Sequence, residues 1–455
     1  MKKILFAVLV MTSVLANAQD VKSDTIKAVS VDSLETQSID SVKTVSIESL
    51  KESIDEHSMK FGALDEKLST MESVLDKLSK IKISGYIQAQ YETFDNWSAD
   101  GSQHGIEAVK GEPRITNSFS VRRARVKFTY EALDGVKFVL QPNFDVDKVT
   151  LKDAYVVLND RWLNTFALYV GQFNRPTYEV EYSSSSREFM ERTLMTRTLY
   201  PTERDQGAKL EADFNTKFNF PLKLQFAVLN GNFGEGAAVN QAKDIDNGKD
   251  FMARAVYSVK LPKQGLGIDF GGHTYLGNAT VISQTTPVPT VFKDVNNNSF
   301  TPAVGDKLKK ELFGGEMQVY YDFLGGMSLK GEYIRGTFSG MTYASEVNSL
   351  FNANKVRNVE GYYAALAKNI GAKYEASIRY DVFDPNTKLS GNGVVAKDDL
   401  KYKTWTFAWQ YFYDENVKIM FCYNLPVNEK SLNAGADFKT DKRDNTFSIR
   451  IQAKF

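Results

Sequence analysis

The sequence contains very little cysteine and histidine. Cys422 is the only cysteine among 455 residues, and the three histidines are His57, His104 and His273. A single cysteine excludes an intrachain disulfide, and no H-E-x-x-H or G-x-S-x-G pattern occurs. We therefore expect no metal site, no cofactor and no enzymatic activity. A hydrolase that uses His273 and a nearby serine is the one catalytic arrangement that the residues leave open.

Long apolar segments are absent after residue 18. The chain begins with Lys2 and Lys3, continues with an apolar run over 4–15, and reaches the small residues 16–18 before Gln19. This pattern predicts a secretory signal peptide over 1–18. The run is too short to span ~30 Å of hydrocarbon, and no later stretch approaches the ~20 apolar residues of a transmembrane helix. The exported protein is therefore either soluble outside the cytoplasm or a β-barrel.

The chain also lacks an excess of charge of either sign, with 56 basic and 56 acidic residues. We expect no nucleic-acid partner, because such proteins carry a strongly basic surface. Residues 19–80 hold 8 basic and 13 acidic residues, whereas 81–455 hold 46 and 43. The second region is slightly basic, which is compatible with a preference for anions. Aromatic residues make up 12% although mean hydropathy is -0.34, a combination that suits a barrel with aromatic girdles and a watery lumen.

Residues 47–80 carry a heptad repeat. The 3-4 spacing of its seam predicts a coiled coil; the seam consists of Ile47, Leu50, Ile54, His57, Phe61, Leu64, Leu68, Met71, Leu75 and Leu78. In a parallel bundle, Lys60 would meet Asp65 of a neighbouring helix and Lys67 would meet Glu72. The repeat favours a parallel oligomer and does not decide between two and three strands.

Two other interpretations of this region stay open. A single amphipathic helix lying on the barrel would also be apolar on one side, although a straight helix drifts from a 3.5-residue repeat. His57 in the seam either sets the register or acts as a pH switch. The preceding residues 19–46 are rich in Ser, Thr, Asp and Val without a lasting period, and we expect them to form a flexible tether.

From residue 81 onward the period changes to two, which predicts β-strands. In 445–455, apolar residues alternate with polar ones, so one face suits lipid and the other a watery lumen. Similar runs predict a sixteen-stranded antiparallel transmembrane β-barrel over 81–455, with strands at 81–94, 118–133, 136–145, 149–158, 165–173, 207–214, 222–229, 250–260, 267–276, 310–321, 327–338, 357–369, 372–383, 402–413, 417–425 and 445–455.

The connections between these strands alternate in length. Those after even-numbered strands are short, and all but one of those after odd-numbered strands are long, as in outer-membrane barrels with short periplasmic turns and long external loops. An even strand number then leaves both termini, and the coiled coil, in the periplasm of a bacterium. The terminal Phe455 is expected to be the aromatic signal for the barrel-assembly machinery.

Several segments resemble the phosphate-selective porins O and P. The Arg-rich stretch 121–126 is similar to the second strand of that family. The run 171–173 followed by Pro176 also resembles the family. Residues 191–192, Pro201 and 204–207 resemble its long third loop and the strand after it. The resemblance covers about 81–455 and implies a trimeric sixteen-stranded porin whose third external loop folds inward and narrows the pore. Well-known members select phosphate with a ladder of basic residues in the lumen, and a full ladder is not traceable here.

Residues 174–206 are the candidate constriction loop. Ser185 and Glu188 have the spacing of a capping box, which predicts a short helix that also contains Glu191. Five arginines face six acidic residues in this loop; the arginines are Arg175, Arg187, Arg192, Arg197 and Arg204. Arginine patches are what anion pores use, while the alternative is that these charges pair with one another and hold the loop against the wall.

The second strand adds three basic residues. By alternation, Arg123, Arg125 and Lys127 point into the lumen, because Lys or Arg facing lipid near the midplane costs roughly 2–4 kcal/mol. The pattern of apolar residues changes phase near Arg122, which predicts a β-bulge. Two arginines elsewhere on polar faces could extend a basic track, namely Arg379 and Arg450.

The predicted function is passive diffusion of small, preferably anionic, solutes through an outer-membrane pore. Its expected partners are membrane lipid, the solutes, the assembly machinery and further copies of the chain, three in all. The alternative is a structural or adhesive barrel whose helix tethers the envelope, and a lumen blocked by packed side chains would favour that alternative.

Overall fold

The computed structural model describes residues 47–95, 116–144, 148–201, 203–231, 244, 246–281, 284, 286–339 and 354–455. The expected signal peptide and tether lie outside these residues. The chain divides into two compact units, Met1–Glu72 and Ser73–Phe455. No helix in the described part of the chain is long and apolar enough to cross a membrane.

Helix α2 (Ile47–Ser79) covers the heptad segment. From Ile54 to Leu78 its apolar seam side chains are exposed to solvent, from 53% at Leu75 to 65% at Phe61, and His57 is exposed with them. Lys60 pairs with Glu56 on the same helix at 2.5 Å. The predicted helix is therefore present, while the coiled coil stays a prediction.

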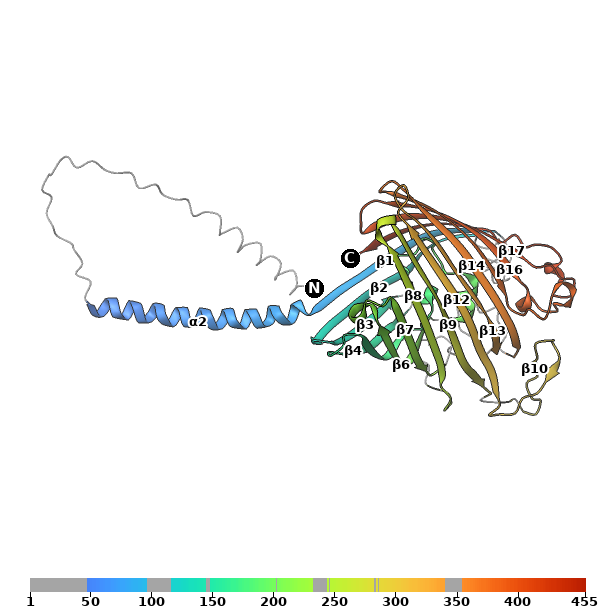
Figure 1. The fold of residues 1–455 in the computed structure, drawn as a ribbon, viewed down its shortest axis with the longest axis horizontal. Helices are drawn as coiled ribbons and strands as arrows, with labels where there is room; N and C mark the ends of the chain where they lie inside the picture. The colour runs from blue at the N-terminus through green and yellow to red at the C-terminus, as the bar shows by residue number, and fades with distance from the viewer. Residues whose placement is uncertain are drawn as a thin grey trace, which may run out of the picture. The chain divides into compact units, whose positions relative to one another are not determined.

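The second unit is a closed antiparallel barrel of sixteen strands (Figure 1). Each strand pairs with its neighbours along the chain, and the first and last pair with each other. The strands are β1 (Ile81–Phe94), β2 (Asn117–Leu133), β3 (Val136–Phe144), β4 (Val149–Asn159), β5 (Phe166–Asn174), β6 (Arg204–Asp213), β7 (Leu222–Leu229), β8 (Asp250–Leu261), β9 (Leu266–Thr280), β12 (Lys307–Tyr321), β13 (Met327–Ser339), β14 (Val356–Ile370), β15 (Tyr374–Asp384), β16 (Tyr402–Phe412), β17 (Val417–Asn428) and β18 (Thr446–Lys454).

The predicted fold class and strand number of the barrel are confirmed. The strand boundaries differ where hydrogen-bonded pairing continues beyond the residues that alternate between apolar and polar. β6 begins at Arg204 because Arg204 pairs with Asn174 of β5. β9 continues to Thr280, which pairs with Lys307 of β12. A two-stranded sheet of β10 (Phe292–Lys293) and β11 (Ser299–Phe300) in the connection before β12 was not predicted.

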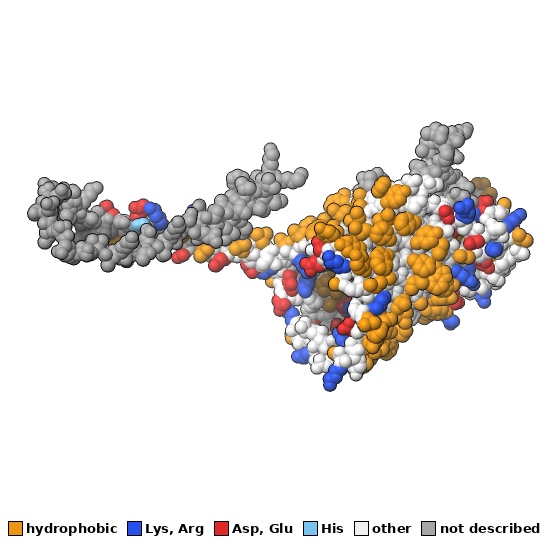
Figure 2. Space-filling model, turned by 90° about the horizontal axis from the view of Figure 1, so that it is seen from above, with side chains coloured by type: hydrophobic (Ala, Val, Ile, Leu, Met, Phe, Trp, Pro, Cys, Tyr) orange, Lys and Arg blue, Asp and Glu red, His pale blue; other side chains and the backbone are white. Residues whose placement is uncertain are grey.

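The barrel wall is apolar outside and polar inside. On β16, Trp405, Phe407 and Trp409 are exposed, while Thr406 and Gln410 are buried. Figure 2 shows apolar side chains spread over the strand wall, with most charged ones toward the ends of the barrel. Apolar surface that would be buried in a soluble protein thus faces outward, as lipid requires.

A bulge re-aims the second strand. Gln88 of β1 faces Arg123, but the next residue, Ala89, faces Val121, so Arg122 has no partner in the register. The predicted bulge near Arg122 is confirmed. An extra residue bends the strand locally, and it lets both Arg122 and Arg123 reach the same group inside the barrel, as shown below.

The barrel closes where β1 meets the C-terminus. The Gly85 amide donates to the Phe455 carbonyl at 2.9 Å, and the Phe455 amide donates to the Gly85 carbonyl at 3.0 Å. A Cβ atom on Gly85 would lie 2.4 Å from the Arg125 carbonyl oxygen and 2.6 Å from the Phe455 ring. Glycine is needed here because two backbones and one aromatic ring converge. The role of Phe455 in barrel assembly stays a prediction.

We predict that Gly85→Ala lowers the free energy of unfolding by about 1–3 kcal/mol, because the added methyl group overpacks the closing seam. Urea unfolding in detergent, followed by heat-modifiable mobility on gels, measures the loss. The control is Gly267→Ala, whose added Cβ would meet only Tyr320 at 3.9 Å. Equal stability of the two variants would contradict this account of the seam.

Candidate functional site: the loop inside the barrel

The connection between β5 and β6 lies inside the barrel, and we call residues 175–203 the inner loop. Lys418 of β17 donates to the Arg187 carbonyl at 3.1 Å, and Arg254 of β8 donates to Glu181 at 2.8 Å. β8 and β17 are distant in the strand order of the closed wall. The inner loop must therefore cross the lumen to reach both, as the family resemblance implies.

Apolar packing attaches one side of the inner loop to the wall. Val180, Phe189, Met195 and Leu199 are buried in one cluster with wall residues; these include Leu312, Ile334, Phe338, Val359 and Tyr363. Gly361 of β14 makes the close approach possible, because a Cβ atom there would lie 2.7 Å from the Met195 sulfur. Burying these side chains holds the inner loop in one position.

The inner loop contains two short helices, and neither begins at Ser185. α3 spans Tyr178–Glu181 and α4 spans Leu194–Leu199. α4 is capped by Thr193, whose hydroxyl accepts from the Thr196 amide. The predicted capping-box helix is thus wrong, and Ser185, Glu188 and Glu191 all lie outside helices.

The capping box fails because its partners have stronger bonds elsewhere. The Glu188 carboxylate pairs with Lys330 of β13 and accepts from the Tyr182 hydroxyl at 2.9 Å. The Ser185 amide instead donates to the Ser183 hydroxyl. A charge-assisted bond to the wall is roughly twice as strong as a neutral one, so the tertiary contact prevails over the local motif.

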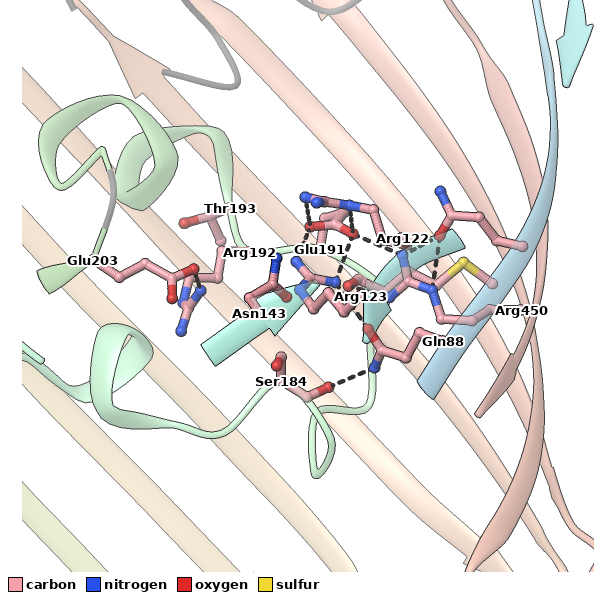
Figure 3. A network of polar contacts seen from close by, with 12 residues as sticks. Gln88, Arg122, Arg123, Asn143, Ser184, Glu191, Arg192, Thr193, Glu203 and Arg450 are labelled. Carbon is pink, nitrogen blue, oxygen red and sulfur yellow. Dashed lines mark hydrogen bonds and ion pairs between the residues drawn. The ribbon is translucent and has the colours of Figure 1, made fainter. Parts of the chain in front are cut away.

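Glu191 is the centre of a charged network between the inner loop and the wall (Figure 3). Its carboxylate accepts from Arg122 at 3.1 Å, from Arg123 at 2.9 Å and from Arg450 at 2.7 Å. Arg450 also donates to the Met190 carbonyl at 2.7 Å. A fourth arginine, Arg379 of β15, donates to the Glu191 carbonyl at 3.0 Å. One residue of the inner loop thus joins β2, β15 and β18.

The charge state of Glu191 follows from these contacts. Glu191 belongs to the inner loop and not to a membrane-spanning strand. Burial raises the pKa of its carboxyl. Arg122, Arg123 and Arg450 lower the pKa by more than burial raises it, so the net pKa lies well below the usual range. The carboxylate is therefore ionised at neutral pH, and buried ion pairs of this kind need full hydrogen bonding to be stable.

The other acidic residues of the inner loop are also bonded. Glu181 accepts from Lys209 at 3.3 Å in addition to Arg254. Glu203 pairs with Arg192 and Arg204. Glu179 accepts from the Thr193 amide at 2.8 Å and from its hydroxyl at 2.6 Å. These contacts agree with the interpretation that charges hold the loop against the wall.

Arg187 differs from these residues. It is 3% exposed, and none of its three guanidinium nitrogens has a hydrogen-bond partner among the described residues. Arg123, Glu191, Glu179 and Tyr86 lie close enough to interact with it electrostatically. Burial, and then repulsion from Arg123, lower the pKa of Arg187 to about 9, so the group is cationic at neutral pH.

The remaining predicted residues lie at several places on the lumen side. Arg125 donates to the Tyr86 hydroxyl at 2.9 Å and to Asn143 at 3.2 Å. Arg175 pairs with Asp205 at 2.8 Å. The other predicted cations, half-buried, are Lys127 and Arg197. Only Arg123, Arg187, Arg379 and Arg450 thus gather around the segment 187–191.

Sequence reasoning missed several cations that contact the inner loop, namely Lys209, Arg254, Lys330 and Lys418. Alternation places Lys418 on the lumen face, as the apolar residues beside it indicate. The contact with the inner loop is not visible in the sequence, because the loop and β17 are more than 200 residues apart.

A cavity of about 620 Å³ borders the inner loop. Tyr182 and Glu188 line it from the inner loop, and Lys330 and Glu375 line it from the wall. Its other boundary consists of short-turn residues near 262–267 and 322–328. The lumen therefore contains open, charged space on the short-turn side of the inner loop.

The fold and the inner loop define a class: a sixteen-stranded outer-membrane diffusion channel with an inward-folded loop. The chain belongs to the family of phosphate-selective porins O and P, whose model matches residues 96–455. The fold is similar to that of OprB of Pseudomonas putida at high pH, with 10% identity, 85% of this chain and 96% of that chain covered, and a TM-score of 0.53.

A second similar structure is OmpF of Salmonella typhi in complex with daunomycin, with 11% identity, 82% of this chain and 97% of that chain covered, and a TM-score of 0.50. No curated protein matches the sequence. Family and fold indicate an outer-membrane channel rather than an enzyme. The described contacts of His273, which involve Tyr200 and Glu332, include no serine.

We predict that Glu191→Gln lowers the free energy of unfolding by about 3 kcal/mol, because the buried Arg123 and Arg450 and the partly exposed Arg122 lose their shared carboxylate. Urea unfolding in detergent measures the change. The control is Glu311→Gln, which removes a solvent-exposed pair with Lys309 and should cost at most about 1 kcal/mol. If the two variants lose the same stability, Glu191 does not anchor the inner loop.

Proposed function

We propose that this outer-membrane porin, which lets small solutes diffuse passively, prefers anions such as phosphate at the inner loop. The observation that carries the proposal is the buried, cationic Arg187, whose guanidinium has no hydrogen-bond partner among the described residues. An oxyanion can accept two parallel N–H bonds from a guanidinium. Anion pores use arginine and lysine in this way.

The charge distribution supports the same preference. The acidic groups of the inner loop are bonded to wall cations or to Thr193, as at Glu191 and Glu188. Their negative charge is thus largely neutralised, whereas Arg187 keeps its positive charge. In a narrow passage with low-dielectric walls, one such charge raises the local concentration of anions.

We predict that Arg187→Gln shifts the reversal potential under a KCl gradient toward cations and weakens block of the current by added phosphate at least severalfold. Planar-bilayer recordings of the purified full chain measure both quantities. The control is Arg161→Gln, because Arg161 is exposed in a turn and, within the described chain, donates only to the Asp134 carbonyl.

Two results would count against the proposal. Unchanged selectivity in Arg187→Gln would remove Arg187 from the anion path. Folded, heat-modifiable wild-type protein without any conductance would instead favour the structural barrel, in which the packed inner loop seals the lumen.

We further propose that α2 forms a parallel three-stranded coiled coil on the periplasmic side. Its support is the heptad seam, whose apolar side chains stay exposed from Ile54 to Leu78. Exposed apolar stripes of this length mark association surfaces. Lys60 and Lys67 would meet Asp65 and Glu72 of neighbouring copies at the flanking positions.

We predict that Leu64→Glu combined with Leu68→Glu weakens or abolishes the trimer, because two charges per chain enter the seam. Multi-angle light scattering in detergent measures the mass of the assembly. Ser69→Glu, on the outer side of the same repeat, serves as the matched control. Intact trimers in the double variant would show that the barrels associate without the helix.

A further inference from the structure

We propose that His273, Glu316 and Glu332 form a divalent-metal site inside the barrel wall, of the kind that binds Zn²⁺. The three side chains come from β9, β12 and β13, and each can offer one ligand atom within 4.8 Å of the others. All three face the lumen side and are buried, at 5%, 5% and 3% exposure. Imidazole nitrogen and carboxylate oxygen are ordinary zinc ligands.

Glu332 is the first indication that something is bound here. No side chain of the described residues donates a hydrogen bond to either of its carboxylate oxygens, and the donor that lies near them is the backbone amide of Glu179. A buried carboxylate is costly unless it is paired, protonated or coordinated to a metal. Its nearest ring is His273, whose Nδ1 lies 3.8 Å from a Glu332 oxygen and also lacks a hydrogen bond in the described chain. Two unsatisfied groups thus point at the same small space.

The strand register brings two carboxylates together. Glu316 and Glu332 are directly opposite each other on β12 and β13, an arrangement in which like charges repel. Arg254 compensates Glu316 with two bonds, at 3.0 and 2.7 Å. Glu332 has no comparable cation hydrogen-bonded to it in the described structure. A divalent cation between the two carboxylates would remove the repulsion.

Gly314 allows His273 to reach the site. His273 faces Gly314 on β12, so its ring must cross that strand to approach Glu332 on β13, roughly two strand spacings of ~4.8 Å away. A Cβ atom on Gly314 would lie 2.2 Å from the ring. Any residue other than glycine would displace the imidazole.

The surroundings of the His273 ring also suit a bound metal. The His273 Nε2 atom lies 3.4 Å from the hydroxyl of Tyr200 at the end of α4 in the inner loop. A hydrogen bond on the free nitrogen orients a metal-binding histidine and fixes its tautomer. A zinc ion with bonds of ~2.0–2.2 Å keeps its ligand atoms about 3.4 Å apart. Ligand atoms that now lie within 4.8 Å of one another therefore need to close by at most about 1.4 Å. The metal would thereby join three strands and, through Tyr200, the inner loop.

The test uses the full chain purified in detergent, stripped with a chelator and titrated with Zn²⁺ alone. Mass spectrometry of bound metal is expected to give one Zn²⁺ per chain. Co²⁺ in place of Zn²⁺ should show the d–d absorption bands of a cobalt ion that is coordinated by protein side chains. Glu332→Gln should weaken binding at least tenfold while the chain remains folded. Mg²⁺, which prefers oxygen ligands and octahedral geometry, should not compete.

A pair of glycine variants separates the site from general effects on folding. Gly314→Ala should weaken Zn²⁺ binding because it displaces the His273 ring. Gly315→Ala, one residue along the same strand, meets no atom closer than 3.9 Å and should bind as the wild type does. Absence of Zn²⁺ binding in folded wild-type protein would overturn the proposal. Equal binding by wild type and Glu332→Gln would overturn it as well.

Discussion

The rest of this structure depends on one constraint, which is that every backbone polar group inside a membrane must be hydrogen-bonded within the protein. A sheet satisfies the constraint only when its first and last strands pair, as β1 and β18 do at Gly85 and Phe455. Closure then divides the side chains of each strand between lipid and lumen. The arginines and carboxylates of the strands have no place but the lumen, and the lumen must neutralise them.

The inner loop performs much of that neutralisation. Glu191 pairs with Arg122, Arg123 and Arg450, and Glu188 pairs with Lys330. Buried ion pairs add little net stability when compared with apolar packing, but they are costly to break. The high cost of breaking these ion pairs explains why a charged loop can be held rigidly across a water-filled barrel. It also sets apart Arg187, a buried cation without such a bond among the described residues, which we propose as the residue where the loop acts on a passing anion.

The lumen wall between β9 and β13 also carries buried charges, but there only one of two neighbouring carboxylates is paired with an arginine. Glu316 is neutralised by Arg254, whereas Glu332 across from it is left beside His273. Within the described part of the wall, Glu332 lacks a hydrogen-bonded cation and His273 Nδ1 lacks a hydrogen bond, and the proposed metal site rests on this pair. The inner loop contacts His273 through Tyr200, which follows α4. The loop that holds Arg187 and the wall that holds Glu332 are therefore physically connected.

The sequence by itself determined the barrel, the sixteen strands, the bulge at Arg122 and the heptad helix, because alternation and heptad spacing are local consequences of which solvent each face meets. It also located the loop between β5 and β6. It misplaced the helix at Ser185, and it could not show that Glu191 binds arginines of β2, β15 and β18 or that His273 lies beside Glu332. Those contacts depend on strand register and on a loop crossing the lumen, which only the closed tertiary structure decides, since the partners are far apart in the chain and share no spacing.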